Sequence, residues 1–327
     1  MEQILRNSRV LVTGGAGFIG SNLIESLLKE GNRVFCLDNF STGKRENLAG
    51  YIDNASFTLI EGDIRNYDDC VKSVKNIDVV FHQAALGSVP RSIKDPVSST
   101  DVNIGGFVKM LFASKEARVK RFIFAASSST YGDYPDLPKV EDKIGIPLSP
   151  YAITKYVDEL FASNFASSYG IEVIGLRYFN VFGRRQDPDG AYAAVIPKFI
   201  TILMKRESPV INGDGSISRD FTYIDNVIQA NHLAAIVSKK GALNQIYNVA
   251  HGERTTLNQL FKIIRELAAK LDKDIMTIEP GYGPFRPGDV PHSHASIEKA
   301  KRLLGYSPTH NVAQGLEETV NWFWENL

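Results

Sequence analysis

Cysteine and long apolar runs are scarce in this sequence, and each scarcity excludes a class of protein. The 327 residues include only two cysteines, Cys36 and Cys70, so we expect no disulfide framework and a reducing compartment. No apolar run reaches the length of a transmembrane helix, and the first ten residues lack the apolar core of a signal peptide. We therefore expect a cytoplasmic protein with no membrane partner.

An excess of charge is also missing. Lys+Arg and Asp+Glu both number 37, so the formal net charge is zero, which argues against nucleic acid as a partner. Hydrophobic residues make up 43% and charged residues 23%, typical of a globular protein with one large or two modest domains. The six histidines show no spacing typical of a metal site, so we expect no metal.

Apolar runs and amphipathic stretches alternate over the first 178 residues. The expected strands are Val10–Thr13, Val34–Asp38, Phe57–Glu61, Val79–His82, Arg121–Ala125 and Val173–Arg177. The expected helices are Ile19–Lys29, Tyr67–Val74, Val97–Ala117 and Pro150–Tyr169. This alternation predicts a Rossmann-type doubly wound α/β fold, a parallel sheet with helices on both faces.

The remainder of the chain has longer loops that are rich in Gly, Pro and Arg. The helices expected there are Ala193–Lys205, Asn226–Val237, Leu257–Ala269, Ser296–Leu304 and Val312–Glu325. We predict a dinucleotide-binding domain over 1–178 and a smaller mixed α/β substrate domain over 179–327. A segment near 225–250 is expected to pack back on the first domain.

A glycine-rich turn follows the first expected strand. Gly14, Gly17 and Gly20 fit a tight turn, a close approach of pyrophosphate to the backbone, and packing of helix on strand. Asp38 ends the next strand. A carboxylate at this position accepts a hydrogen bond from the ribose 2′-hydroxyl and disfavours a 2′-phosphate. The pattern predicts NAD as the cofactor.

Other polar residues fall close to the ends of expected strands, where ligands bind in open α/β sheets. Asp63 follows the third strand and Gln83 the fourth, and we expect both to contact the cofactor. Lys44 and Arg45 lie just beyond Asp38 and would soften its preference for NAD over a phosphorylated cofactor.

Tyr151 and Lys155 lie in a segment that begins with two helix-start signals. Ser149 is typical of an N-cap and Pro150 of the first helical position. Residues four apart share a helix face, and a nearby positive charge favours the ionised form of a phenol. Tyr151 would then act as a base at neutral pH. Such pairs also arise by chance on helices, so this one gains weight only beside the other motifs.

A run of hydroxyls follows the fifth expected strand. Ser127, Ser128 and Ser129 come directly after its apolar residues, at an edge where they would hydrogen-bond a substrate oxygen beside Tyr151. Taken alone, the run is an ordinary serine-rich loop.

Together these segments resemble the extended short-chain dehydrogenase/reductase superfamily, and within it the nucleotide-sugar 4-epimerases. The resemblance covers nearly the whole chain and is more specific for the superfamily than for the epimerases. The matching segments are Thr13–Gly20, Asp38–Asn39, Gly62–Asp63, Ala84–Ala85, Ser127–Gly132, Pro150–Lys155, Arg177–Val181 and Arg286–Asp289. It implies tightly bound NAD, a UDP-sugar substrate and a homodimer formed through the helices at 97–117 and 150–169.

The resemblance also implies roles for single residues. Tyr151 would be the base, Lys155 would contact Tyr151 and the nicotinamide ribose, and one of Ser127, Ser128 and Ser129 would bond the reacting sugar oxygen. The implied cofactor contacts are Gly14, Gly17, Phe18, Ile19, Gly20, Asp38, Asn39, Asp63, Ile64, Gln83, Ala84, Ala85, Tyr151, Lys155 and Tyr178. The implied substrate contacts are Ser129, Tyr151, Asn180, Val195, Ile211, Arg219, Arg286, Asp289 and Ser293.

Ser293 bears on the choice of sugar. Members of the family restricted to glucose carry a bulky tyrosine four residues after the position of Asp289, and a serine there leaves room for a 2-acetamido group. The resemblance is closest to the UDP-N-acetylglucosamine 4-epimerases, which form UDP-N-acetylgalactosamine through a 4-keto intermediate. Their products feed bacterial surface polysaccharides.

Several alternatives compete with this reading. A 4-epimerase of UDP-glucose or of a UDP-hexuronate would share the same machinery, and Arg184 or Arg185 would face a hexuronate carboxylate. A dehydratase needs an added acid/base pair, but the stretch from Ser127 to Thr130 contains no carboxylate. A non-enzymatic NAD-binding sensor is disfavoured because Tyr151 and Lys155 are both present.

Overall fold

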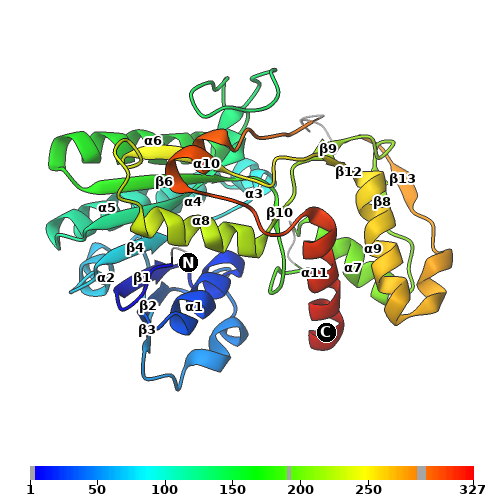
Figure 1. Ribbon diagram of the computed structural model, residues 1–327, viewed down its shortest axis with the longest axis horizontal. Helices are drawn as coiled ribbons and strands as arrows, with labels where there is room; N and C mark the ends of the chain where they lie inside the picture. Colours follow the sequence, from blue (N-terminus) through cyan, green and yellow to red (C-terminus); the bar gives the residue numbers. More distant parts are fainter. Residues whose placement is uncertain (1–3, 190–192, 286–291) are drawn as a thin grey trace.

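Seven parallel strands form a single sheet in the described part of the chain. The computed structural model describes residues 4–189, 193–285 and 292–327. The sheet order is β3-β2-β1-β4-β5-β6-β11, which confirms the predicted Rossmann-type doubly wound architecture (Figure 1). The strands are β1 (Arg9–Thr13), β2 (Arg33–Asp38), β3 (Phe57–Glu61), β4 (Val79–His82), β5 (Arg121–Ser127), β6 (Glu172–Tyr178) and β11 (Gln245–Val249).

Both faces of the sheet are covered by helices, which explains why its strands are almost continuously apolar. Val10 and Val12 of β1 belong to the core cluster that also contains Leu27 of α1 and Val227 of α8. Leu11 between them points to the opposite cluster, among residues of the remaining helices. One face therefore carries α1 (Phe18–Lys29) and α8 (Ile224–Ile236), and the other α2 (Tyr67–Ser73), α5 (Phe107–Glu116) and α6 (Pro150–Tyr169).

The second half of the chain contributes directly to this sheet. β11 pairs in parallel with β6, with Asn248 opposite Arg177. The guanidinium of Arg121 on β5 donates to the carbonyls of Ala234 and Ala235 at the end of α8, at 2.9 and 2.7 Å. The sequence pattern did not predict β11 as a strand. The division at residue 178 stays a prediction.

The helix expected over Val97–Ala117 is divided in the structure. α4 (Pro96–Thr100) leads into a π-helical turn, η2 (Asp101–Gly106), which continues as α5. Asn103 lies buried in this turn, accepts from the backbone N–H of Leu86 at 2.7 Å and donates to the Thr154 hydroxyl at 3.1 Å. π turns occur often at functional sites, and this one ties the end of β4 to α6.

The rest of the described chain consists of helices, very short strands and the loops between them (Figure 1). Helical segments are η1 (Arg45–Tyr51), α3 (Val89–Lys94), η3 (Ser128–Tyr131), α7 (Val195–Met204), α9 (Leu257–Leu271), η4 (Lys273–Thr277), α10 (Glu298–Leu304) and α11 (Val312–Asn326). The short strands are β7 (Val181–Phe182), β8 (Val210–Asn212), β9 (Ser218–Arg219), β10 (Thr222–Tyr223), β12 (Thr255–Thr256) and β13 (Gly281–Gly283).

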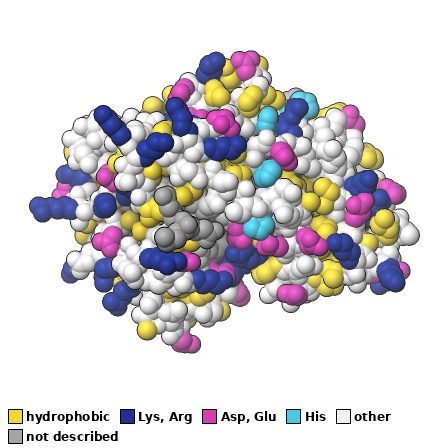
Figure 2. All heavy atoms as spheres, viewed as in Figure 1, with side chains coloured by type: hydrophobic (Ala, Val, Ile, Leu, Met, Phe, Trp, Pro, Cys, Tyr) yellow, Lys and Arg dark blue, Asp and Glu magenta, His cyan; other side chains and the backbone are white. Residues whose placement is uncertain are grey.

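The surface reflects the balanced composition of the chain. Basic and acidic side chains are interspersed over the face shown in Figure 2. Among the described residues, no helix is both long and apolar enough to span a membrane.

Candidate active site

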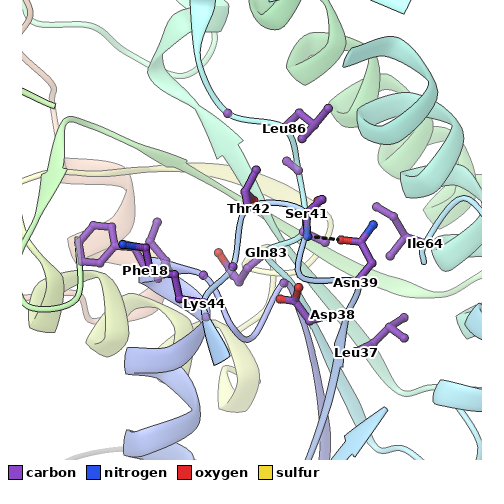
Figure 3. A pocket seen from close by; sticks show the side chains of 18 of the residues that line it. Phe18, Leu37, Asp38, Asn39, Ser41, Thr42, Lys44, Ile64, Gln83 and Leu86 are labelled. Carbon is purple, nitrogen blue, oxygen red and sulfur yellow. Dashed lines mark hydrogen bonds between the residues drawn. The ribbon is translucent and has the colours of Figure 1, made fainter. Parts of the chain in front are cut away.

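A cavity of about 350 Å³ opens at the carboxyl ends of β1, β2 and β4. The strand order reverses between β1 and β4, which is where doubly wound sheets bind ligands. Figure 3 shows side chains from the end of β2, the loop after it and the end of β4 gathered around this cavity. Of the predicted cofactor contacts, Gly14, Gly17, Phe18, Ile19, Gly20, Asp38, Asn39, Asp63, Ile64, Gln83, Ala84 and Ala85 line it.

The glycine-rich turn is packed so closely that a side chain on Gly14 or Gly20 would clash with the backbone. Gly14 has a φ of +68°, and a Cβ on it would lie 2.7 Å from the backbone of Ala84. A Cβ on Gly20, in the first turn of α1, would lie 2.2 Å from the Gly14 carbonyl oxygen. The turn therefore packs closely on the loop after β4 and on the start of α1, and its glycines line the cavity at the N-terminus of that helix, where a phosphate would bind.

Asp38 is fixed at the end of β2. Its carboxylate accepts from the backbone N–H groups of Ala16 at 2.9 Å and Phe40 at 2.8 Å. Each oxygen keeps a lone pair for a ribose hydroxyl. Burial raises the pKa of Asp38, while these backbone hydrogen bonds favour its charged form.

The two basic residues beyond Asp38 are already paired. Lys44 lines the cavity but forms an ion pair with Asp187 at 2.8 Å. Arg45 makes two hydrogen bonds to the carboxylate of Glu61. Because both positive charges are paired with carboxylates, they should attract a 2′-phosphate less than the sequence suggested. The preference of Asp38 for NAD is therefore less affected than expected.

Tyr178 does not line this cavity but supports a residue that does. Its hydroxyl lies within hydrogen-bond distance of Gln83 at 3.2 Å and Asn231 at 3.0 Å, in a buried network that joins β6, β4 and α8. Burial raises the pKa of Tyr178 to about 12, so this phenol stays neutral. Gln83 is thereby held at the cavity wall.

Sequence reasoning missed part of this wall. The further lining residues are Leu37, Ser41, Thr42, Gly43, Asn47, Gly62, Leu86, Gly87, Val102, Arg185 and Asp187, besides Lys44. Asn47 donates to the Ala16 carbonyl at 2.8 Å and so holds the 3₁₀ helix η1 against the glycine-rich turn. Loop residues of this kind show no periodic pattern from which they could be predicted.

α6 begins as predicted and carries Tyr151 and Lys155 to the end of β5. The Ser149 hydroxyl caps the helix by accepting from the Ala152 N–H, and Pro150 is in the first turn. The buried ammonium of Lys155 donates to the carbonyl of Ala125 on β5 at 3.0 Å. Its second partner is Asp158, one turn further along α6, at 3.2 Å.

The three serines adopt different positions at the end of β5. Ser127 is the last residue of the strand and is 8% exposed. Its hydroxyl oxygen accepts from the backbone N–H of Ser129 at 3.1 Å and from the Ser129 hydroxyl at 2.9 Å. Ser128 and Ser129 are half-buried in η3. Ser127 and Ser129 thus form a linked pair of hydroxyls.

A second cavity, of about 290 Å³, is built by the other half of the chain. The predicted substrate contacts Asn180, Val195 and Arg219 line it. Ile211 does not, because its side chain points into the core and is 1% exposed. Val210 and Asn212, its neighbours on β8, line the cavity instead, as strand alternation requires.

The remaining predicted substrate contacts lie in the segment after β13. Arg286 and Asp289 lie outside the described residues. Ser293 is half-buried, and its backbone N–H donates to the Ser218 carbonyl at 3.1 Å, beside Arg219.

Asp220 joins the segment that contains Ser293 to the loop after β11, and sequence reasoning missed it. Its buried carboxylate accepts from the backbone N–H groups of His251, Gly252 and Ala295. Burial raises the pKa of Asp220 to about 6, although the backbone hydrogen bonds favour its charged form. Its partners come from distant parts of the sequence, so no local signal marks it.

Arg184 and Arg185, the residues suggested as partners of a hexuronate carboxylate, already form ion pairs within the protein. Arg184 pairs with Asp225 at 2.9 Å, and Arg185 pairs with Glu25 at 2.6 Å. Burial raises the pKa of Glu25, but hydrogen bonds from Lys29 and Arg185 more than offset this and lower it to about 2. Glu25 is therefore fully charged at neutral pH and holds its arginine partner.

One group of possible metal ligands occurs among the described residues. Atoms of Asp225, His310 and Glu318 lie within 4.8 Å of one another. However, Arg184 donates to Asp225, and the Tyr223 hydroxyl donates to Glu318 at 2.6 Å. Two of the three possible ligands therefore already accept hydrogen bonds from protein side chains.

The family is shown by comparison with known proteins. Residues 10–250 match the model of the NAD dependent epimerase/dehydratase family. The UDP-N-acetylglucosamine 4-epimerase of Methanobrevibacter ruminantium M1, solved with UDP-N-acetylmuramic acid, is 40% identical with a TM-score of 0.92, over 99% of this chain and 100% of that one.

Two further relatives carry other names. The UDP-glucose 4-epimerase of Thermotoga maritima, solved with UDP-glucose, is 38% identical with a TM-score of 0.89, over 97% of this chain and 99% of that one. The UDP-glucuronate 4-epimerase of Thermodesulfobacterium geofontis is 36% identical over 97% of this chain and 96% of its own. The match, the fold and the cradle at β1 agree with the prediction of an NAD-dependent enzyme, and the chain belongs to the NAD dependent epimerase/dehydratase family.

Proposed function

We propose that the protein is a nucleotide-sugar 4-epimerase that interconverts UDP-N-acetylglucosamine and UDP-N-acetylgalactosamine. The observation that carries this is the position of Tyr151 and Lys155. They lie one turn apart on α6, and the Lys155 ammonium bonds to β5 at the same sheet edge where the dinucleotide cavity opens. The names of these relatives support the epimerase class.

The residues of this chain supply a base, an electrostatic partner and a hydrogen-bond donor. Tyr151 as phenolate takes the proton from the 4-hydroxyl of the sugar, and Lys155 favours the phenolate by its charge. The linked hydroxyls of Ser127 and Ser129 orient the reacting oxygen. NAD⁺, when bound, supplies the hydride acceptor and returns the hydride, so that net redox is zero.

The second cavity is assigned to the nucleotide. Asn180 and Arg219 supply polar groups for the diphosphate, and the apolar side chains of Val195 and Val210 supply walls for the base. Holding the nucleotide while the 4-keto sugar rotates lets both faces of C4 meet the cofactor. This assigns the nucleotide sugar to residues 179–327.

The acetylated sugar is favoured by Ser293. Its small side chain is half-buried beside the Ser218–Arg219 strand. The family resemblance implies that a tyrosine at this position would exclude a 2-acetamido group. A solved relative in complex with UDP-N-acetylmuramic acid also binds an N-acetylated sugar.

A UDP-hexuronate is the second candidate, because a relative is named a UDP-glucuronate 4-epimerase. The sequence suggested Arg184 or Arg185 as partners for the hexuronate carboxylate. Both are neutralised by Asp225 and Glu25, which argues against that assignment. UDP-glucose remains the third candidate, from the Thermotoga maritima relative.

A homodimer fits the apolar side chains left exposed on the helices around η2. Val97 of α4 is 77% exposed, and Leu160 of α6 is 52% exposed. Phe112 of α5 and Ile153 of α6 are also exposed. Burial of such side chains against a second copy would remove apolar surface from water.

The substrate assignment is tested by Ser293→Tyr. We expect this variant to lose at least tenfold in kcat/KM with UDP-N-acetylglucosamine, since even a modest clash costs about 1.4 kcal/mol or more, and to retain turnover of UDP-glucose. Ser307→Tyr, at an exposed position between α10 and α11, is the matched control. Unchanged turnover of the acetylated sugar by Ser293→Tyr would show that this position does not define the pocket.

A further inference from the structure

Asp158 is a buried carboxylate to which the proposed reaction gives no role. It lies on α6 with no exposed surface. One of its oxygens accepts from the Lys155 ammonium at 3.2 Å, and the other, Oδ1, is buried with no hydrogen-bond partner within the described ranges. A buried carboxylate with half of its acceptors unused costs stability. Stability alone therefore does not explain an acid at this position.

Its position on the helix relates Asp158 to the catalytic pair. Tyr151, Lys155 and Asp158 are spaced i, i+4 and i+7, so they share one face of α6. Two helical turns separate Tyr151 from Asp158, about 10 Å along the axis, with the ammonium of Lys155 next to the acid. Phenol, cation and carboxylate thus follow one another along one stripe of the helix.

The hydrogen bonds of Lys155 show what Asp158 does locally. An ammonium has three donors. One is directed at the Ala125 carbonyl and one at Asp158. The third is left for the nicotinamide ribose, the contact that the family resemblance assigns to Lys155. Asp158 and Ala125 therefore fix the orientation of the ammonium from two sides.

We propose that Asp158 is a positioning residue that orients the Lys155 ammonium and, through its negative charge, limits how strongly that ammonium favours the phenolate of Tyr151. The inference rests on the proposed function only for the role of Tyr151 as base. Removing the charge of Asp158 leaves the full charge of Lys155 acting on the phenol, so Tyr151 ionises at lower pH.

The other ionisable groups near this face of α6 should not change charge over the pH range in which Tyr151 ionises. Glu159, next to Asp158, is held by two hydrogen bonds from Arg177 on β6. His82 on β4 is neutral because burial, and then the charge of Lys155, lower its pKa to about 3. Burial raises the pKa of Asp158 itself to about 7, partly offset by Lys155, so Asp158 is charged in the alkaline range.

Two hydrogen bonds that reach this part of α6 from α3 and η2 come from uncharged groups. The Ser92 hydroxyl of α3 accepts from the Tyr151 backbone N–H at 3.0 Å, and the Asn103 amide of η2 donates to the Thr154 hydroxyl.

The test measures the ionisation of Tyr151 directly. The ultraviolet absorbance of tyrosinate is followed against pH in the purified, NAD-loaded protein and in Asp158→Asn, each corrected with its own Tyr151→Phe partner. Asp158→Asn is nearly isosteric and should lower the midpoint of Tyr151 ionisation by about one pH unit, the effect of one full charge at about 10 Å with an effective dielectric constant near 20. The acid limb of the pH–rate profile should move in the same direction.

Glu172→Gln is the matched control. It also removes a carboxylate charge next to a basic partner, Arg121, but at the opposite end of β6 from the site, so its midpoint should equal that of the wild type. Asp158→Ala, which removes the charge without an amide, should give the same displacement as Asp158→Asn and replaces it if that variant does not fold.

Coincident midpoints for the wild type and the Asp158 variants would overturn the proposal, as would an equal displacement in Glu172→Gln. Because the readout is ionisation and not turnover, it does not depend on which sugar the enzyme accepts. A failure of this inference is thereby distinguishable from a failure of the proposed function.

Discussion

Gly20 shows how closely single residues in the cofactor cradle are constrained. An added methyl group would lie 2.2 Å from the Gly14 carbonyl oxygen and 2.7 Å from the Gly15 Cα, both backbone atoms that cannot move without shifting the turn. We expect Gly20→Ala to lower the affinity for NAD by about tenfold or more, equivalent to about 1.4 kcal/mol or more, measured as NAD released from purified protein. Gly50→Ala, where an added Cβ meets nothing within 4 Å, should retain its NAD. Equal NAD content in both variants would contradict the role of the cradle.

At the same scale, local patterns marked residues at strand ends but not residues whose partners are distant in sequence. The predicted cofactor contacts from Gly14 to Ala85 follow strand ends, and in the structure they line one cavity at one edge of the sheet. Asp220 escaped prediction because its backbone partners are brought to it only by the folded chain. Ile211 was assigned to the substrate, but the alternation of β8 turns it into the core. The side-chain orientation of a three-residue strand depends on what packs on it, which the sequence does not state.

Two ion pairs that join elements differ in burial, so loss of one should cost more stability than loss of the other. Arg177 on β6 and Glu159 on α6 form a pair whose side chains are 3% and 6% exposed, whereas Arg45 and Glu61 form a pair exposed by 59% and 58%. Glu159→Gln leaves the buried guanidinium without its countercharge, so we expect a loss of about 3 kcal/mol in the free energy of unfolding. Glu61→Gln should cost less than about 1 kcal/mol. Denaturant titration of both variants checks this, and comparable losses would contradict the role of burial.

Elements with a strong period were predicted with bounds close to those observed, and elements without one were not. β3, β4 and α6 have the predicted bounds, because each combines an apolar pattern with clear end signals. The sequence pattern predicted continuous helix through the π turn η2. The turn depends on the packing of Asn103 against α6, which the local pattern does not contain. β7, β9, β10 and β12 have two residues each, which is too short for any periodicity.

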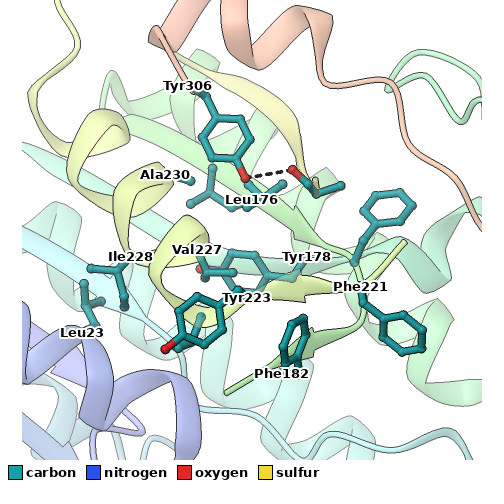
Figure 4. Close-up of a cluster of buried hydrophobic side chains, with 14 of the residues drawn as sticks. Leu23, Leu176, Tyr178, Phe182, Phe221, Tyr223, Val227, Ile228, Ala230 and Tyr306 are labelled. Carbon is teal, nitrogen blue, oxygen red and sulfur yellow. Dashed lines mark hydrogen bonds between the residues drawn. The ribbon is translucent and has the colours of Figure 1, made fainter. Parts of the chain in front are cut away.

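At the scale of the whole molecule, the two halves of the chain share one core. Figure 4 shows Val227 of α8 beside Tyr178 of β6, with Leu176 and Tyr306 above them, and Ile228 of α8 beside Leu23 of α1. A fragment that ends at residue 178 would leave this face of the sheet and the β6 edge uncovered. We expect such a fragment to aggregate and to bind no NAD, in contrast to the full chain. Cooperative unfolding and stoichiometric NAD in the fragment would instead establish residues 1–178 as an independent domain.

The central claim is C4 epimerisation by a protein that retains its own NAD. Its most direct test is proton NMR of purified protein with UDP-N-acetylglucosamine, and separately with UDP-glucose, with no cofactor added. We expect UDP-N-acetylgalactosamine to accumulate to equilibrium, faster than the corresponding conversion of UDP-glucose, and Tyr151→Phe to abolish both. Absence of any C4 epimer from either sugar, in protein shown to contain NAD, would contradict it.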